Sequence, residues 1–270
     1  SDGWRPGAGG AQPIVSPGDG GVVAHAGIAD ESDVERAGAS AAAAQAEWGR
    51  TSHRTRADVL LGAAAALREI RAEVEHVLIR ESGSLPGKAS HEVDKAVDEL
   101  VAAAGLVTMS QGDLLPVEDP ATIGMARRIP VGVVGVISPW NAPLMLAIRS
   151  VAPAIALGNA VLLKPDVKTA FSGGAAIAGV FRRAGLPDGV LHVLPGGPET
   201  GEAVVRSPHT AVISFTGSSA AGRRVGEVAG GLLKRVVLEL GGNNAFVLMA
   251  DADLDRAVAA GVAGSFRHQG

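Results

Sequence analysis

The spacing of hydrophobic residues changes along the chain, from a helical period in its first third to short β-rich runs in its second half. The N-terminal coil, rich in glycine and proline, is predicted to hold one short strand at 21–26. Ser32, with Glu35 three residues later, predicts a capping box at the start of a helix through an alanine-rich stretch. Residues 56–70 are predicted to form a second helix, and a third is predicted over 91–107. In the second helix the apolar positions at helical spacing are Ala57, Leu60, Leu61, Ala64 and Leu67.

Short apolar runs alternate with stretches of helical length after a change of character near residue 112. Two short segments flank an Asp-Pro turn within 112–132, which predicts a hairpin that leaves the main body. The β-rich runs that follow are 131–137, 160–164, 189–194, 211–215 and 235–240. Nearly continuous apolar strands with helical crossovers predict a mostly parallel sheet covered on both faces. The expected fold class is therefore α/β, with a Rossmann-like, mostly parallel sheet, flanking helices, N-terminal helices and a protruding β-hairpin.

Composition narrows the class of protein. Of 270 residues, 47% are hydrophobic and 19% are charged, which is typical of a globular protein. The formal net charge of −4, with no basic stripe, argues against a nucleic-acid partner. There is no cysteine, so these residues hold no disulfide, no thiolate metal site and no thiol nucleophile. The seven histidines show no spacing typical of metal ligands, and no metal site is expected.

Targeting signals are not apparent in the sequence. The N-terminus is polar and glycine-rich without an apolar core of a signal peptide, and it begins with Ser, which suggests processing or excision. The longest apolar stretch, 143–163, is interrupted by Arg149, Pro153 and Asn159, so no membrane partner is expected. A cytoplasmic location is the expectation for such a chain.

Candidate chemistry lies in the loops after the predicted strands, because ligands of parallel sheets bind beyond the carboxyl ends of the strands. Asn141 follows the first of these strands between two prolines; its amide could donate to an oxyanion or simply stabilise a turn. Lys164 ends the second, where a buried charge calls for an anionic partner unless its ammonium reaches solvent.

Two further loops hold glycines and a carboxylate. Thr216, Gly217 and Ser218 come at the end of a strand, and Gly222 lies in the first turn of the next helix; such backbones favour phosphates, although the GxxxxG spacing is a weak signal. No Lys-Ser/Thr follows Gly222, which excludes a Walker-type loop. Glu239 precedes a pair of glycines and is either structural or a general base towards water.

Taken together, the segments SPWNAP, LLKP, GLPDGVLHVLPG, FTGSSAAG, LELGGNNAF and DADLD…FRHQG, in this order, resemble the aldehyde dehydrogenase superfamily. The similarity covers essentially the whole chain from the N-terminal helices onward. LLKPDVKTAFSGG together with FRHQG looks closest to the benzaldehyde, or aromatic-aldehyde, branch. The resemblance implies a division into an N-terminal helical part of the cofactor domain (1–111), an oligomerisation hairpin (112–130) and a Rossmann-like NAD(P)-binding core (131–270), with the catalytic domain absent.

The resemblance also assigns roles. Asn141 would hold the oxyanion of a tetrahedral intermediate, and Glu239 would activate water to release a free acid rather than a coenzyme A ester. Trp140 would lie beside the pyrophosphate, and Lys164 would contact the adenosine ribose. The full set of expected cofactor-binding residues is Ile137, Ser138, Pro139, Trp140, Lys164, Thr216, Gly217, Ser218, Gly222, Leu240 and Gly241.

Two departures from the family pattern matter. Many relatives carry a glutamate three residues after the ribose-binding lysine, but this chain has Val167, so we expect both NAD and NADP to bind. The family's catalytic cysteine would lie just beyond Gly270, and we expect these residues alone to be inactive. The complete enzyme would oxidise an aldehyde substrate as a homo-oligomer; the alternative is a non-catalytic nucleotide-binding or interaction module.

Overall fold

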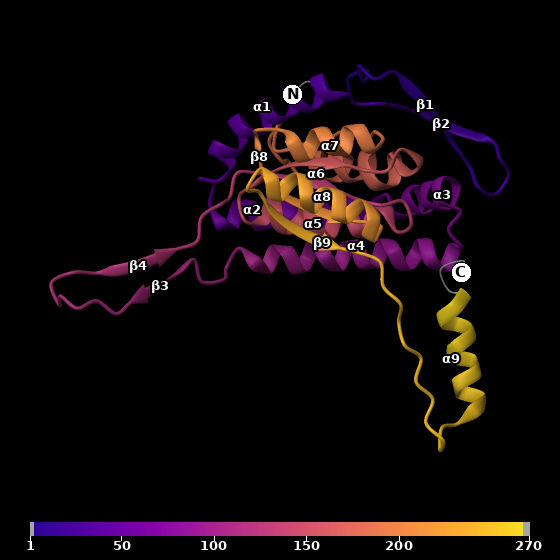
Figure 1. The fold of residues 1–270 in the computed structure, drawn as a ribbon. Helices are drawn as coiled ribbons and strands as arrows, with labels where there is room; N and C mark the ends of the chain where they lie inside the picture. Colours follow the sequence, from indigo (N-terminus) through magenta and orange to yellow (C-terminus); the bar gives the residue numbers. More distant parts are fainter. Residues whose placement is uncertain (1–2, 267–270) are drawn as a thin grey trace.

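A parallel sheet forms the centre of the structure, a computed structural model that describes residues 3–266. Its strands are β5 (Val133–Ile137), β6 (Ala160–Lys164), β7 (Leu191–Val193), β8 (Thr210–Thr216) and β9 (Arg235–Glu239). They lie in the order β7-β6-β5-β8-β9, and every neighbouring pair is parallel. All five predicted runs are therefore confirmed as strands, and the α/β class is confirmed with them (Figure 1).

The direction in which successive strands are added to the sheet reverses at β5. Strands β6 and β7 are added on one side of β5, whereas β8 and β9 are added on the other. The register aligns Ile137 of β5 with Lys164 of β6 and Phe215 of β8, and aligns Thr216 of β8 with Glu239 of β9. The loops that follow these strands consequently leave from one edge of the sheet. The helical crossovers are α5 (Pro143–Ala156), η1 (Val167–Thr169), η2 (Phe171–Ala175), α6 (Ala176–Arg183), α7 (Pro198–Arg206) and α8 (Ser219–Gly231).

Alternate residues of the central strands pack on opposite helical layers. In β6, Val161 and Leu163 join the core with α2, α4, α5 and α6, whereas Ala160 and Leu162 face α1 and α7. This alternation follows from the period of two in a strand, and burial on both faces explains why these runs are continuously apolar. Gly135 of β5 lies so close to α7 that a Cβ there would come within 2.7 Å of Val204 Cγ1.

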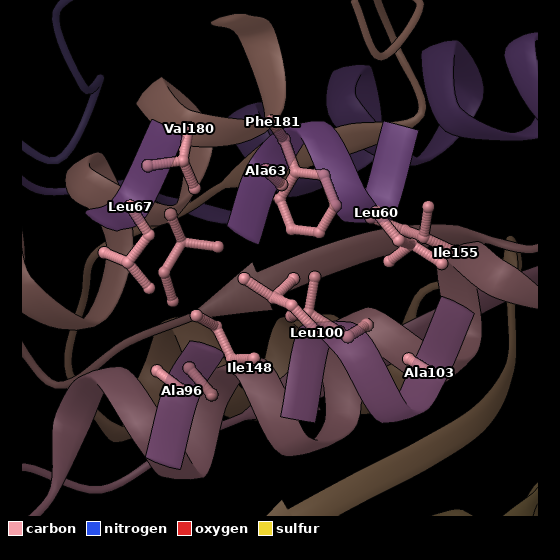
Figure 2. Packing of buried hydrophobic residues seen from close by; sticks show 14 of the residues in the cluster. Leu60, Ala63, Leu67, Ala96, Leu100, Ala103, Ile148, Ile155, Val180 and Phe181 are labelled. Carbon is pink, nitrogen blue, oxygen red and sulfur yellow. The ribbon is translucent and has the colours of Figure 1, made fainter. Parts of the chain in front are cut away.

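Four helices precede the sheet: α1 (Glu31–Trp48), α2 (His53–Glu69), α3 (Arg71–Ser82) and α4 (Pro86–Leu106). Figure 2 shows the core between them and the sheet helices, where Leu60 and Leu67 of α2 face Leu100 of α4, Ile148 of α5 and Phe181 of α6. The helix predicted over 56–70 is confirmed. The predicted helix over 91–107 is confirmed too, but it begins earlier, at Pro86, a residue type suited to the first helical turn.

Two sequence predictions for this region need correction. The capping box of α1 is formed by Asp30 and Asp33, not by Ser32 and Glu35: the Asp30 side chain accepts from the Asp33 N–H at 3.1 Å. Asp33 also accepts from the Ala8 N–H at 2.7 Å, so contact with the N-terminal coil favours this register. Helix α3 was not predicted. Its only buried residues are Val74, Leu78 and Glu81, so its buried face is narrow and includes a charged side chain.

Two antiparallel hairpins lie outside the central sheet. One pairs β1 (Ala11–Val15) with β2 (Val22–Gly27), although only one strand was predicted there. The other pairs β3 (Gly112–Leu115) with β4 (Gly124–Arg127), as predicted. Figure 1 shows the β3–β4 hairpin projecting away from the layered body.

The chain leaves the body after β9. Helix α9 (Leu254–Phe266) has no buried residue, and Figure 1 shows it standing apart from the sheet and its helices. Across residues 3–266, no helix combines the length and the apolar character that a membrane crossing requires.

Candidate functional site

A cavity of about 1120 Å³ opens at the edge of the sheet where the strands end. It is bordered by the loops after β5, β6 and β8, next to the point where strand order reverses, which is where ligands bind in open α/β sheets. Eight of the predicted cofactor-binding residues line it: Ile137, Ser138, Pro139, Trp140, Lys164, Thr216, Gly217 and Ser218. The structure thus brings together residues from three separate loops.

Lys164, the last residue of β6, presents a cation to this cavity. Its side chain is buried, and burial lowers its pKa, an effect that Asp166 and Glu199 partly oppose. Within residues 3–266 its ammonium has neither a hydrogen-bonding nor an ion-pair partner. A buried cation without a partner favours binding of an anionic or hydroxyl-bearing ligand.

The loop after β6 is held from below by a buried carboxylate. Glu81, near the end of α3, accepts from the backbone N–H groups of Phe171 and Ser172 at 2.9 and 2.7 Å, and from the Ser172 hydroxyl at 2.6 Å. Burial raises the pKa of Glu81, while these hydrogen bonds act in the opposite direction. Helix α3 therefore fixes the start of η2 beneath the cavity.

Cations also lie along the rim. Lys168 of η1 sits over the Trp140 ring, with Nζ 5.7 Å from the ring centroid. Asp166 caps η1 by accepting from the Lys168 N–H at 3.0 Å. Val167 lines the cavity, so at this position the wall presents an apolar side chain.

The loop after β8 prepares the first turn of α8 for an anion. Ser218 is the N-cap of α8 and accepts from the Ala221 N–H at 3.2 Å. A Cβ on Gly217 would come within 2.6 Å of Cζ of the buried Phe215 ring, so only glycine fits between strand and helix. The positive end of the α8 dipole thus opens on the cavity.

An apolar slot between α7 and α8 continues the cavity. Val205 of α7 and Val225 and Val228 of α8 line it. At its rim Arg224 donates to Glu202 at 2.9 Å, and the pKa of Glu202 is lowered by its bonds to Arg206 and Arg224. Flat, uncharged rings fit slots of this composition.

Gly222, Leu240 and Gly241 do not line the cavity. The Cα of Gly222 packs against the Leu240 side chain, and a Cβ on Gly241 would lie 3.7 Å from Ser219 Oγ. These three residues form the contact between the first turn of α8 and the chain after β9. Their contact with a cofactor stays a prediction.

The two predicted catalytic residues leave the same edge of the sheet. Asn141 follows β5 in the loop before α5, and Glu239 ends β9, where its carbonyl accepts from the Gly217 N–H at 3.0 Å. Both side chains are exposed. That the side chains of Asn141 and Glu239 share one reaction site stays a prediction.

Sequence reasoning missed a buried ion pair on α4. Lys88 and Glu92, one helical turn apart, are 5% and 3% exposed, with Nζ 3.5 Å from Oε2. Lys88 donates to the Asn141 carbonyl at 2.7 Å, and Glu92 accepts from the Leu144 N–H at 2.9 Å. The i, i+4 spacing was visible in the sequence, but such pairs are usually solvent-exposed. Within residues 3–266 no cluster of three or more side chains suited to a metal ion occurs.

Fold and cavity define a doubly wound α/β protein with a cavity at the switch point of its sheet. Residues 4–270 match the aldehyde dehydrogenase family. The chain is 54% identical over 267 residues to a vanillin dehydrogenase of Amycolatopsis sp., covering 99% of this chain and 55% of that protein. It is 47% identical over 270 residues to the NAD(+) benzaldehyde dehydrogenase of Pseudomonas putida, covering 100% of this chain and 55% of that protein.

A solved structure gives the same result. The crystal structure of an NAD-dependent benzaldehyde dehydrogenase from Corynebacterium glutamicum matches with a TM-score of 0.94 and 42% identity, covering 98% of this chain and 59% of that one. This chain belongs to the aldehyde dehydrogenase family, and it spans about 55% of the length of the two curated relatives. The predicted similarity to the aromatic-aldehyde branch is confirmed, since these relatives are vanillin and benzaldehyde dehydrogenases.

Proposed function

We propose that residues 1–270 form the coenzyme-binding part of an NAD(P)-dependent aldehyde dehydrogenase that converts an aromatic aldehyde to its carboxylic acid. The observation that carries this proposal is the cavity at the switch point, which Trp140, Lys164 and Gly217 line from the carboxyl ends of β5, β6 and β8. Relatives named as vanillin and benzaldehyde dehydrogenases support the substrate class.

The lining of the cavity fits a dinucleotide. Lys164 supplies an unpartnered cation for ribose hydroxyls, and the N-terminus of α8 at Ser218 supplies N–H groups for phosphate. The apolar slot between α7 and α8 is suited to adenine. When bound, the nicotinamide ring supplies the hydride acceptor for the oxidation.

Asn141 and Glu239 supply the remaining chemistry of this chain. The Asn141 amide would donate to the developing oxyanion, and the Glu239 carboxylate would take a proton from the water that releases the acid. The thiol nucleophile of the family is not among these residues, because the sequence contains no cysteine. The complete reaction therefore needs a cysteine-bearing part in addition to residues 1–270.

The coenzyme can be either NAD or NADP. Val167 leaves the ribose wall without a carboxylate that would repel a 2′-phosphate, and Lys168 and Arg224 line the same cavity. Selectivity against NADP would require a negative charge close to the 2′-oxygen.

The test is a calorimetric titration of the 270-residue chain with NAD and NADP, alongside Lys164→Met. We expect saturable binding of both coenzymes and at least tenfold weaker binding by the variant. No heat of binding up to millimolar coenzyme would reject the proposal. NADP binding a thousandfold weaker than NAD would reject only the dual specificity.

A second candidate function is a nucleotide-binding or interaction module without catalysis, with which the cavity at the switch point is equally compatible. The coding sequence after Gly270 separates the two. A continuing frame that reads Gln, one residue and then Cys supports the enzyme, and a stop codon supports the module.

A further inference from the structure

The loop that holds Asn141 is anchored at two points by one helix turn of α4. Lys88 Nζ donates to the Asn141 carbonyl at 2.7 Å and to Ser84 Oγ at 2.8 Å. Glu92 Oε1 accepts from the Leu144 N–H at 2.9 Å, at the first turn of α5. The backbone is therefore fixed at Asn141 itself and again three residues later.

The pair is built into the protein interior rather than displayed on its surface. Both side chains are almost fully buried, and within residues 3–266 Glu92 Oε2 has no hydrogen bond, so its near neighbour of opposite charge is Lys88 at 3.5 Å. A buried ion pair gives little net stability, because the cost of desolvation offsets the attraction between the charges. A pair of apolar residues in its place often gives equal or greater stability. The two charged side chains do, however, hold the backbone that they bind in a defined position.

Position matters most for a group that must meet a developing charge. An oxyanion donor works only when its amide lies within hydrogen-bonding distance of the oxyanion, and a displacement of about 1 Å can cost about 100-fold in rate. Asn141 lies in an exposed loop between β5 and α5, and residues 140–142 are not helical. The α4 pair gives the backbone of this loop two hydrogen-bonding anchors in the protein interior.

We propose that Lys88 and Glu92 are positioning residues for Asn141, which hold the oxyanion-donating amide in place through the backbone of its loop. This inference rests on the proposed function, because it needs Asn141 to act as the donor. Neither residue touches substrate or coenzyme in this arrangement; both act through the Asn141–Leu144 backbone.

The test uses the catalytically complete enzyme, with its cysteine-bearing part, and the double substitution Lys88→Met with Glu92→Gln. This variant removes both charges together, so no buried charge is left without its partner, and Gln can still accept from the Leu144 N–H. We expect kcat to fall about 10- to 100-fold with the KM for coenzyme within twofold of wild type. The matched control is Lys95→Met, from an exposed pair on the same helix, and it should leave kcat unchanged.

A double-mutant cycle with Asn141→Ala separates positioning from a general structural effect. Asn141→Ala alone should lower kcat about 100- to 1000-fold, and adding the α4 substitutions should lower it little further. Additive losses, or no loss from the α4 substitutions, would overturn the positioning role and leave the proposed function intact. Wild-type kcat in Asn141→Ala would overturn both.

Thermal unfolding is measured for every variant to confirm that it folds. If the double substitution unfolds the protein, Lys88→Met alone takes its place, because it removes the hydrogen bond to the Asn141 carbonyl, and the buried Glu92, whose pKa is raised by burial, can bind a proton once its partner is gone. That variant should lower kcat at least threefold, and the loss should vanish in the Asn141→Ala background. An unchanged kcat for Lys88→Met would then contradict the inference.

Discussion

Glu81 of α3 and Ser172 of η2, which are far apart in sequence, are joined by two hydrogen bonds: Ser172 donates to Oε2 through its N–H at 2.7 Å and through its hydroxyl at 2.6 Å. Together with Glu92, this carboxylate ties the N-terminal helices to the loops after β6 and β5. The N-terminal part therefore shapes the floor of the cavity, although only a few of its residues line it.

Ser172→Ala is expected to destabilise the chain by about 1.5–3 kcal/mol, because a buried charged acceptor loses its hydroxyl donor. Chemical unfolding in urea measures this difference. Ser32→Ala, which removes an exposed hydroxyl that donates to Asp30, is the control and should change stability by less than about 0.5 kcal/mol. Equal effects of the two substitutions would show that Glu81 does not depend on this donor.

Ionisation of Glu81 should contribute to the pH dependence of the chain's stability. Burial raises its pKa above the ordinary value of 4.5, so the folded chain binds the proton more tightly than the unfolded chain. Its contribution to stability is then fully present below pH 4.5 and is lost as pH rises through the raised pKa. Glu81→Gln, which cannot ionise, should lose less stability than wild type over that interval.

Glu202→Gln provides a control of opposite sign for this pH series. Arg206 and Arg224 lower the pKa of Glu202, so its contribution is present above pH 4.5 and is lost as pH falls. Urea unfolding at a series of pH values compares both variants with wild type. Parallel pH profiles for wild type and Glu81→Gln would contradict the assignment.

Coenzyme affinity should fall as pH rises, because burial lowers the pKa of Lys164 in the free chain and a bound anion would raise it again. Binding then takes up a proton in the interval between the two pKa values, where affinity weakens by up to about tenfold per pH unit. Titrations at several pH values measure the slope, and Lys164→Met should abolish it. A slope that survives in this variant would assign the titration to another group.

Val167→Glu should make the cavity selective for NAD. A carboxylate beside the 2′-position repels a phosphate, so NADP affinity should fall at least about tenfold while NAD affinity changes little. Val167→Gln has the same shape without the charge and should leave both affinities within about threefold of each other. Loss of both coenzymes in Val167→Glu would indicate a damaged cavity rather than a change in selectivity.

We propose that the β3–β4 hairpin supports homo-oligomerisation. Leu114 and Met125 pair across its strands and are 78% and 66% exposed, and this hairpin projects from the body. Leu114→Lys with Met125→Glu should shift the chain towards monomer in sedimentation velocity. Leu233→Lys, at an apolar position outside the hairpin that is 95% exposed, should not. A wild-type monomer at all concentrations would count against this role.

The parallel sheet was predictable because its central strands, β5 and β6, are buried on both faces and therefore read as continuous apolar runs. Several residues lining the cavity were predictable too, since Lys164 ends β6, Gly217 directly follows β8, and Trp140 lies in the loop after β5. The capping box was misplaced because two overlapping patterns fit the sequence, and a tertiary bond from Ala8 to Asp33 selects the earlier one. Lys88 and Glu92 were missed because local sequence does not show which charged residues will be buried against a loop 50 residues away.

The most direct test of the dinucleotide cavity is NMR mapping of the isotope-labelled 270-residue chain during titration with NAD. We predict that the largest shift changes fall on Ser138, Trp140, Lys164, Gly217 and Ser218, at the carboxyl ends of β5, β6 and β8. Changes that instead cluster on the β1–β2 hairpin or on α9, with these five residues unaffected, would contradict a coenzyme site at the switch point.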